Sequence, residues 1–92
     1  MNLVIIGTGY VGLVTGVGFA SLGNTVSFVD LDENKVSKLK DKQVPFYEPG
    51  LEEHFQDNDT FSRMSFTSSY EEIDWEDTDV AFICVQTPNN HD

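Results

Sequence analysis

Three glycines follow an apolar run near the start of the chain, in the segment LVIIGTGYVG at residues 3–12. Their positions, Gly7, Gly9 and Gly12, have the G-x-G-x-x-G spacing that brings a phosphate group close to the main chain. Gly7 permits a tight turn, Gly9 has no Cβ to obstruct a pyrophosphate, and Gly12 lets a helix pack closely on the preceding strand. The spacing therefore predicts a turn that binds a diphosphate.

A carboxylate stands where a dinucleotide would need one. Asp30 ends a second apolar run, TVSFVD at 25–30, eighteen residues after Gly12. A carboxylate at that place can accept hydrogen bonds from both hydroxyls of an adenosine ribose, and it would repel a 2′-phosphate. The pattern favours NAD over NADP, and the alternative is a glycine-rich turn beside a surface aspartate.

The predicted elements bring these two groups to one edge of a sheet. Short apolar segments predict strands at 2–6, 25–30, 64–68 and 80–85, the last one buried on both faces. Apolar spacing and capping residues predict helices over 11–22, 33–41 and 49–56, and a turn at 57–60. Asp32 is expected to cap the second helix.

This alternation of strands and helices predicts an α/β fold with right-handed crossovers. The expected architecture is half of a Rossmann-type fold, a four-stranded parallel sheet in the order 3-2-1-4 with flanking helices, truncated after the fourth strand. Residues 1–92 would form one partial domain. In a complete fold further strands would pair beside 80–85, so we expect that edge to be apolar and prone to self-association.

The composition narrows the range of partners. Five basic and sixteen acidic residues give a formal net charge of −11, which argues against binding to nucleic acid or to an anionic membrane. The uncharged segment before Asp30 is rich in glycine and has no basic flank, so a targeting or membrane segment is not expected. A single cysteine, Cys84, fits a reducing compartment and a cytoplasmic location.

Four segments together carry a resemblance to a known family. They are GTGYVGLVTG at 7–16, VDLDENKV at 29–36, PFYEPGLEE at 45–53 and FICVQTP at 82–88. In order and spacing they resemble the UDP-glucose and GDP-mannose dehydrogenase family, and the third segment looks most like the UDP-glucose 6-dehydrogenases. The resemblance covers essentially the whole chain but only the N-terminal part of such an enzyme.

The resemblance implies an oxidation of a sugar C6 alcohol to a carboxylate, with two NAD reduced and a cysteine thioester as intermediate. The cofactor-binding residues that it implies are Gly7, Gly9, Tyr10, Val11, Gly12, Asp30, Lys35 and Thr87. Lys35 has an equally good interpretation as an exposed helix cation. Gln86 stands where relatives usually have a smaller residue, so it departs from the family pattern.

No catalytic residue is expected in this chain. The resemblance places the family's nucleophilic cysteine, its lysine and its sugar-binding residues beyond residue 92, so NAD binding without turnover is expected and a nucleotide sugar would bind only a full-length protein. Cys84 lies in a predicted strand with no histidine or cation close by in sequence, which favours a core thiol. No spacing of His, Cys and carboxylates indicates a metal site.

The alternative function is a non-catalytic, truncated module that self-associates through its fourth strand.

Overall fold

Strands and helices alternate along residues 1–85, the part of the chain that the computed structural model describes. The elements in chain order are β1 (Asn2–Ile6), α1 (Tyr10–Ser21), β2 (Thr25–Val29), α2 (Glu33–Lys40), α3 (Leu51–Gln56), α4 (Asn58–Ser62), β3 (Met64–Thr67), the 3₁₀ turns η1 (Tyr70–Glu72) and η2 (Trp75–Asp77), and β4 (Val80–Ile83). None of the helices in these residues has the length and hydropathy needed to cross a membrane.

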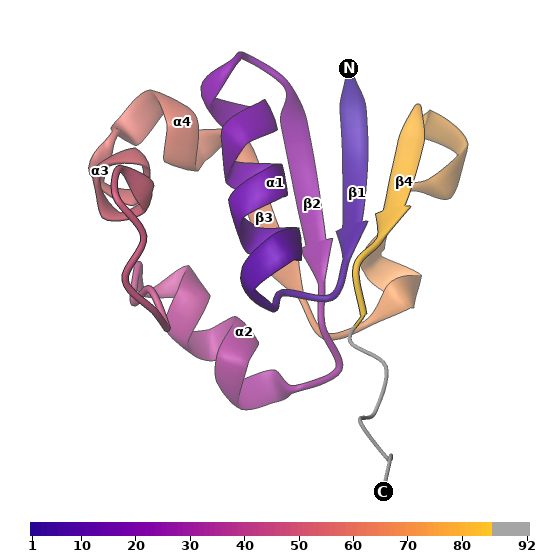
Figure 1. Ribbon diagram of the computed structural model, residues 1–92. Coiled ribbons are helices and arrows are strands. Elements are labelled where there is room, and N and C mark those ends of the chain that lie inside the picture. Colours follow the sequence, from indigo (N-terminus) through magenta and orange to yellow (C-terminus); the bar gives the residue numbers. More distant parts are fainter. Residues whose placement is uncertain (86–92) are drawn as a thin grey trace, which may run out of the picture.

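The four strands form one parallel sheet in the order β3-β2-β1-β4 (Figure 1). β1 lies in the middle, with its last residue, Ile6, opposite Val29 of β2 and Ile83 of β4. Since parallel strands all end at the same edge of a sheet, the turns that follow β1 and β2 meet there. The predicted α/β fold and strand order are confirmed.

Helix α1 packs on one face of the sheet at very short range. A Cβ atom on Gly16 would lie 2.3 Å from the ring of Phe28 and 3.0 Å from the side chain of Ile5. Gly12 and Ala20, one turn to either side, are buried on the same face of the helix. A glycine inside a helix costs about 1 kcal/mol relative to alanine, and here that cost is offset by the close contact between helix and sheet.

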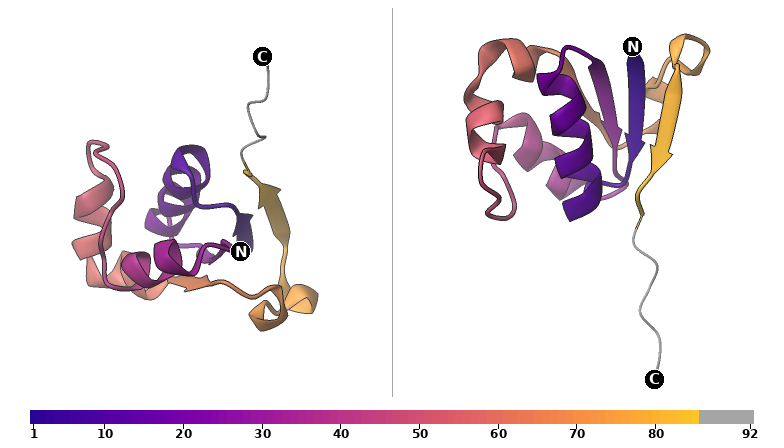
Figure 2. Two further views of the ribbon diagram at one scale, coloured as in Figure 1. Left: turned by 90° about the horizontal axis from the view of Figure 1, so that it is seen from below. Right: turned by 45° about the horizontal axis from the view of Figure 1, so that its top comes forward.

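The main hydrophobic core lies between this face of the sheet and the helices. Its buried members are Leu3, Ile5, Leu13, Val17, Ala20, Val26, Phe28, Val36, Leu39, Leu51, Phe55, Met64 and Phe66. The opposite face carries a smaller cluster of Val4, Val29 and Ile73, on the side where η1 and η2 lie (Figure 2). The sheet is therefore covered by helices on one face and by two short turns on the other.

The prediction of a fully buried fourth strand is wrong. In β4, Val80 and Phe82 pack against the main core, but Ala81 and Ile83 are exposed, Ile83 with 74% of its surface. Successive side chains of a strand point to opposite faces, and among residues 1–85 the helices pack on one of these faces. The apolar run could not show that its second face is exposed.

The prediction of a plain turn at 57–60 is also wrong, because α4 begins there. The carboxylate of Asp57 accepts a hydrogen bond from the amide of Asp59 at 3.0 Å and so caps this short helix. Helix α3 starts two residues later than expected, after Gly50, whose φ is +87°.

Candidate dinucleotide-binding site

The turn between β1 and α1 depends on close approaches of the main chain. Gly7 has a φ of +100°, which side-chain-bearing residues rarely adopt, and its amide donates to the carbonyl of Val29 at 2.8 Å. A Cβ atom on Gly12 would lie 2.1 Å from the carbonyl oxygen of Gly7. The first turn of α1 therefore rests directly on the end of β1.

The outer side of the same turn is open. Gly9 is the N-cap residue of α1, and a Cβ atom there would meet no atom of residues 1–85 within 4 Å. No side chain in the described part of the chain caps this helix, its first turn holds no acidic residue, and Leu13 donates to the carbonyl of Gly9 at 2.9 Å. The preceding amides, of Tyr10, Val11 and Gly12, have no intrahelical acceptor and lie at the positive end of the helix dipole, an arrangement suited to an anion.

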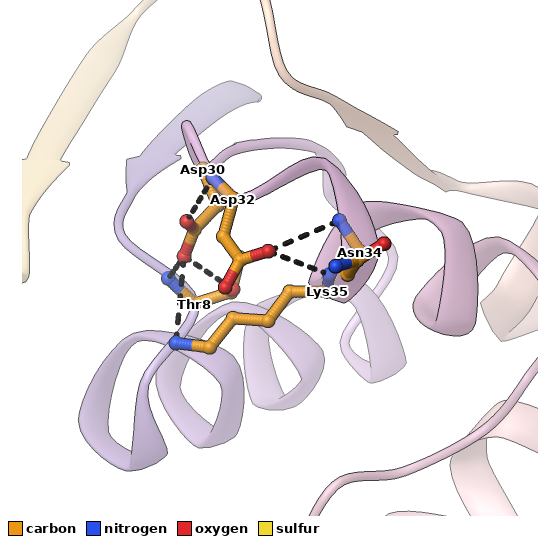
Figure 3. Close-up of polar contacts among 5 residues, drawn as sticks. All are labelled: Thr8, Asp30, Asp32, Asn34 and Lys35. Atoms are coloured by element: carbon orange, nitrogen blue, oxygen red, sulfur yellow. Dashed lines mark hydrogen bonds and ion pairs between the residues drawn. The ribbon is translucent and has the colours of Figure 1, made fainter.

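Asp30 follows β2 at the same edge of the sheet, where Thr8 and Lys35 surround its carboxylate (Figure 3). Its Oδ2 accepts hydrogen bonds from the amide of Thr8 at 2.9 Å and from the Thr8 hydroxyl at 2.6 Å. Its Oδ1 accepts from the amide of Asp32 at 2.9 Å, and the Nζ of Lys35 lies 3.9 Å from Oδ2.

These contacts keep the carboxylate charged. Burial raises the pKa of Asp30, but the hydrogen bonds from Thr8 and Asp32 and the charge of Lys35 outweigh this effect, so the pKa lies below its ordinary value. Asp30 is therefore ionised at neutral pH and held in one orientation.

Helix α2 begins immediately after this carboxylate. The side chain of Asp32 accepts from the amides of Asn34 at 3.0 Å and Lys35 at 3.2 Å, which confirms it as the cap of α2 (Figure 3). The cap fixes the first turn of α2 beside Asp30. Lys35 comes from that turn and keeps 46% of its side chain exposed.

A cleft of 620 Å³ joins the glycine turn to Asp30. Its lining residues are Ile6, Gly7, Thr8, Gly9, Tyr10, Val11, Val29, Asp30, Leu31, Lys35, Tyr70, Cys84 and Val85. A volume of this order is usual for small-molecule sites, which combine an apolar lining with a few placed polar groups.

The structure brings six of the eight predicted cofactor-binding residues to this cleft: Gly7, Gly9, Tyr10, Val11, Asp30 and Lys35. Gly12 lies beneath it, packed on Gly7 and close to Cys84. Thr87 lies outside the described residues, and so does Gln86. The contacts of all eight with a cofactor stay predictions.

Several residues that line the cleft were not predicted from the sequence. Thr8 occupies a position of the glycine motif that any residue can fill, yet it is 1% exposed and bonded to Asp30. Leu31 and Tyr70 line the cleft as exposed apolar surfaces. Cys84 packs against the core, as a core thiol should, but it also reaches the cleft. Thr8 stands directly between Gly7 and Gly9, and nothing in the sequence indicated its bond to Asp30.

The loop before α3 touches the start of α1. The hydroxyl of Tyr10 donates to Oε1 of Glu48 at 2.5 Å, and its ring centroid lies 5.2 Å from that of Phe46. This hydrogen bond raises the pKa of Tyr10, with smaller contributions from burial and from the charge of Glu48. The contact ties the PFYEPG segment to the rim of the cleft.

Comparison with protein families gives one match over the whole chain. Residues 1–92 match the NAD-binding domain of the UDP-glucose/GDP-mannose dehydrogenase family. The chain is 42% identical over 92 residues to UDP-glucose 6-dehydrogenase YwqF of Bacillus subtilis and 45% identical over 92 residues to the UDP-glucose 6-dehydrogenase of Pseudomonas aeruginosa. These alignments cover 100% of this chain but 21% and 20% of those proteins, so the chain spans about a fifth of their length.

Solved structures of similar proteins share the fold. A ternary complex of GDP-mannose dehydrogenase from Pseudomonas aeruginosa superposes with a TM-score of 0.85 and 36% identity, over 98% of this chain and 20% of that one. A UDP-glucose dehydrogenase from Pyrobaculum islandicum gives a TM-score of 0.79 and 42% identity, over 91% of this chain and 19% of that one.

Proposed function

This chain belongs to the UDP-glucose/GDP-mannose dehydrogenase family as its NAD-binding domain, and from that premise we propose that residues 1–92 bind NAD in the cleft between the glycine turn and Asp30. One observation carries the proposal. The open main chain at Gly9, beside the uncapped start of α1, lies in the same cleft as an ionised carboxylate.

The pyrophosphate is assigned to the glycine turn. Gly9 leaves room for it, and the amides of Tyr10, Val11 and Gly12 supply donors aligned with the helix dipole. The chain carries a net charge of −11, but charges more than about 10 Å away are largely screened at physiological ionic strength. Local donors therefore decide whether an anion binds here.

The adenosine ribose is assigned to Asp30. Two hydrogen bonds already reach Oδ2 and one reaches Oδ1, so Oδ1 keeps a lone pair for a ribose hydroxyl. A 2′-phosphate would face this charged oxygen, which favours NAD over NADP. Lys35, whose Nζ lies 3.9 Å from Oδ2, is assigned a place beside the ribose. The family resemblance assigns Thr87 a contact with the cofactor.

For a full-length protein that contains this domain, we propose the activity of a UDP-glucose 6-dehydrogenase, an oxidoreductase. The bound coenzyme would accept hydride as the C6 alcohol of a nucleotide sugar is oxidised to a carboxylate, with two NAD consumed. Residues 1–92 would act as a partial Rossmann domain that binds the coenzyme without turnover, because the resemblance assigns no catalytic residue to them.

Separate calorimetric titrations with NAD and NADP test the proposal. We expect saturable NAD binding by the folded chain and at least about tenfold weaker NADP binding, which corresponds to 1.4 kcal/mol. We also expect no formation of NADH from UDP-glucose and NAD. Folded protein that binds no NAD, or that binds NAD and NADP equally, would contradict the proposal.

A second candidate function rests on β4, which lies at an edge of the sheet formed by residues 1–85. Ile83 is 74% and Val85 60% exposed, and an exposed apolar edge strand can pair with another chain. We propose as the alternative that the chain assembles with a second copy through β4. Sedimentation over a range of concentrations tests this, and a monomer at the highest concentration would exclude it.

A further inference from the structure

We propose that Thr8 is a positioning residue that sets the coenzyme preference of the cleft, by clamping one oxygen of Asp30 so that the other oxygen faces the ribose. The inference rests on the proposed NAD binding and adds to it a residue that lines the cleft with its side chain buried. Thr8 is 1% exposed, so its side chain acts through Asp30.

The contacts around Asp30 define a single free acceptor site. A carboxylate offers about four lone-pair sites. The hydroxyl and the amide of Thr8 both donate to Oδ2, at 2.6 Å and 2.9 Å, and the amide of Asp32 donates to Oδ1 at 2.9 Å. One lone pair of Oδ1 is left, and the clamp determines where it points.

The hydroxyl is the part of the clamp that depends on the side chain. Any residue other than proline at position 8 would supply the amide donor, whereas the hydroxyl needs threonine or serine. Its 2.6 Å bond to a charged oxygen has the length of a strong, charge-assisted hydrogen bond. Without it the carboxylate of Asp30 can turn about its Cβ–Cγ bond and present either oxygen to the ribose.

The variants that test this separate the hydroxyl from the rest of the side chain. Thr8→Val keeps the shape of the side chain and removes the donor, Thr8→Ala removes the donor without adding any bulk, and Thr8→Ser keeps the hydroxyl. Thr60→Val is the matched control, because Thr60 is also a buried threonine, 3% exposed, whose hydroxyl donates to an aspartate, Asp57, at 3.4 Å. Thr60 belongs to α4 and does not line the cleft.

The readout is the dissociation constant of NAD and of NADP, measured by calorimetry on the folded chain. Thr8→Val and Thr8→Ala should weaken NAD binding about five- to tenfold and lower the preference for NAD over NADP. Thr8→Ser and Thr60→Val should bind both coenzymes as the wild type does. In addition, the pH at which NAD affinity falls on acidification should be higher in Thr8→Val, because the pKa of Asp30 rises when the donor is lost.

A second background separates positioning from a general loss of stability. In Asp30→Ala the Thr8→Val change should have no further effect on NAD affinity, since the group through which it acts is gone. An NAD affinity unchanged in both Thr8→Val and Thr8→Ala, or an equal loss in the Asp30→Ala background, would overturn the inference. A wild-type chain that binds no NAD would instead overturn the proposed function and this inference with it.

Discussion

The carbonyl oxygen of Gly7 lies 2.1 Å from the point that a Cβ atom of Gly12 would occupy. The first turn of α1 is thus pressed onto the end of β1, and the turn between them is closed on its inner side. On its outer side, a Cβ atom on Gly9 would meet no atom of residues 1–85 within 4 Å. One motif therefore contains glycines needed for folding and a glycine that leaves room for the diphosphate in the proposed function.

Exchanging Gly12 for alanine should destabilise the chain strongly. The new methyl group would collide with backbone, which cannot move aside as a flexible side chain can, so we expect a loss of about 2 kcal/mol or more in the free energy of unfolding. Urea unfolding measures the loss. Gly18→Ala is the control, because a Cβ atom there would meet no other part of residues 1–85 within 4 Å, and this variant should gain up to about 1 kcal/mol. Equal midpoints for the two variants would contradict the observed packing.

Gly9→Ala should separate binding from folding. The backbone at Gly9, with φ −72° and ψ −169°, suits alanine, and its Cβ would meet no described atom of the chain. The melting temperature should therefore stay close to that of the wild type, while NAD binding weakens at least about tenfold because the methyl group occupies the place assigned to the pyrophosphate. Thermal melts and calorimetry on the same preparation measure both. A variant that is stable and binds NAD normally would show that the diphosphate does not lie here.

The contribution of Asp30 to stability should depend on pH in a defined direction. The pKa of Asp30 is lowered in the folded chain, whereas in the unfolded chain it takes its ordinary value of about 3.9. Its stabilising effect is therefore complete above that ordinary value and is lost as the pH falls through the lower, folded-state pKa. Asp30→Asn should be less stable than the wild type at pH 7, and the difference should shrink on acidification.

Urea unfolding of both proteins at a series of pH values measures this difference. Glu76→Gln serves as the control, because Glu76 is an exposed acidic residue of η2 and removing it changes the net charge equally. A difference between wild type and Asp30→Asn that grows as the pH falls would mean that the pKa of Asp30 is raised, not lowered.

Much of the fold could be predicted because its signals are local and repeated. β-Branched runs indicated β1 and β2, helical spacing indicated α1, and Asp32 marked the start of α2. The meeting of the glycine turn with Asp30 followed from topology alone, since parallel strands end at one edge. Local spacing and strand topology do not depend on the details of side-chain packing.

The features that were not predicted from the sequence share a physical cause, because each depends on which residues come into contact in the folded chain. Asp57 can form a turn or cap a helix through the same kind of side-chain bond to an amide, and the sequence does not say which. Thr8 fills a position of the motif at which any residue fits, so its bond to Asp30 left no pattern. The apolar run of β4 does not show which of its faces is covered.

Replacing Glu48 with glutamine should lower the pKa of Tyr10 toward its ordinary value. The hydroxyl of Tyr10 donates to this carboxylate at 2.5 Å, and the hydrogen bond, burial and the negative charge together raise its pKa. Glutamine keeps an acceptor but removes the charge, so part of the shift should remain. The absorbance of tyrosinate during alkaline titration measures it, with Tyr10→Phe to identify which transition belongs to Tyr10. Glu53→Gln, an exposed change in α3, should leave that transition in place. If Glu48→Gln leaves it in place as well, the loop does not reach the start of α1 in solution, and the rim of the cleft is open on that side.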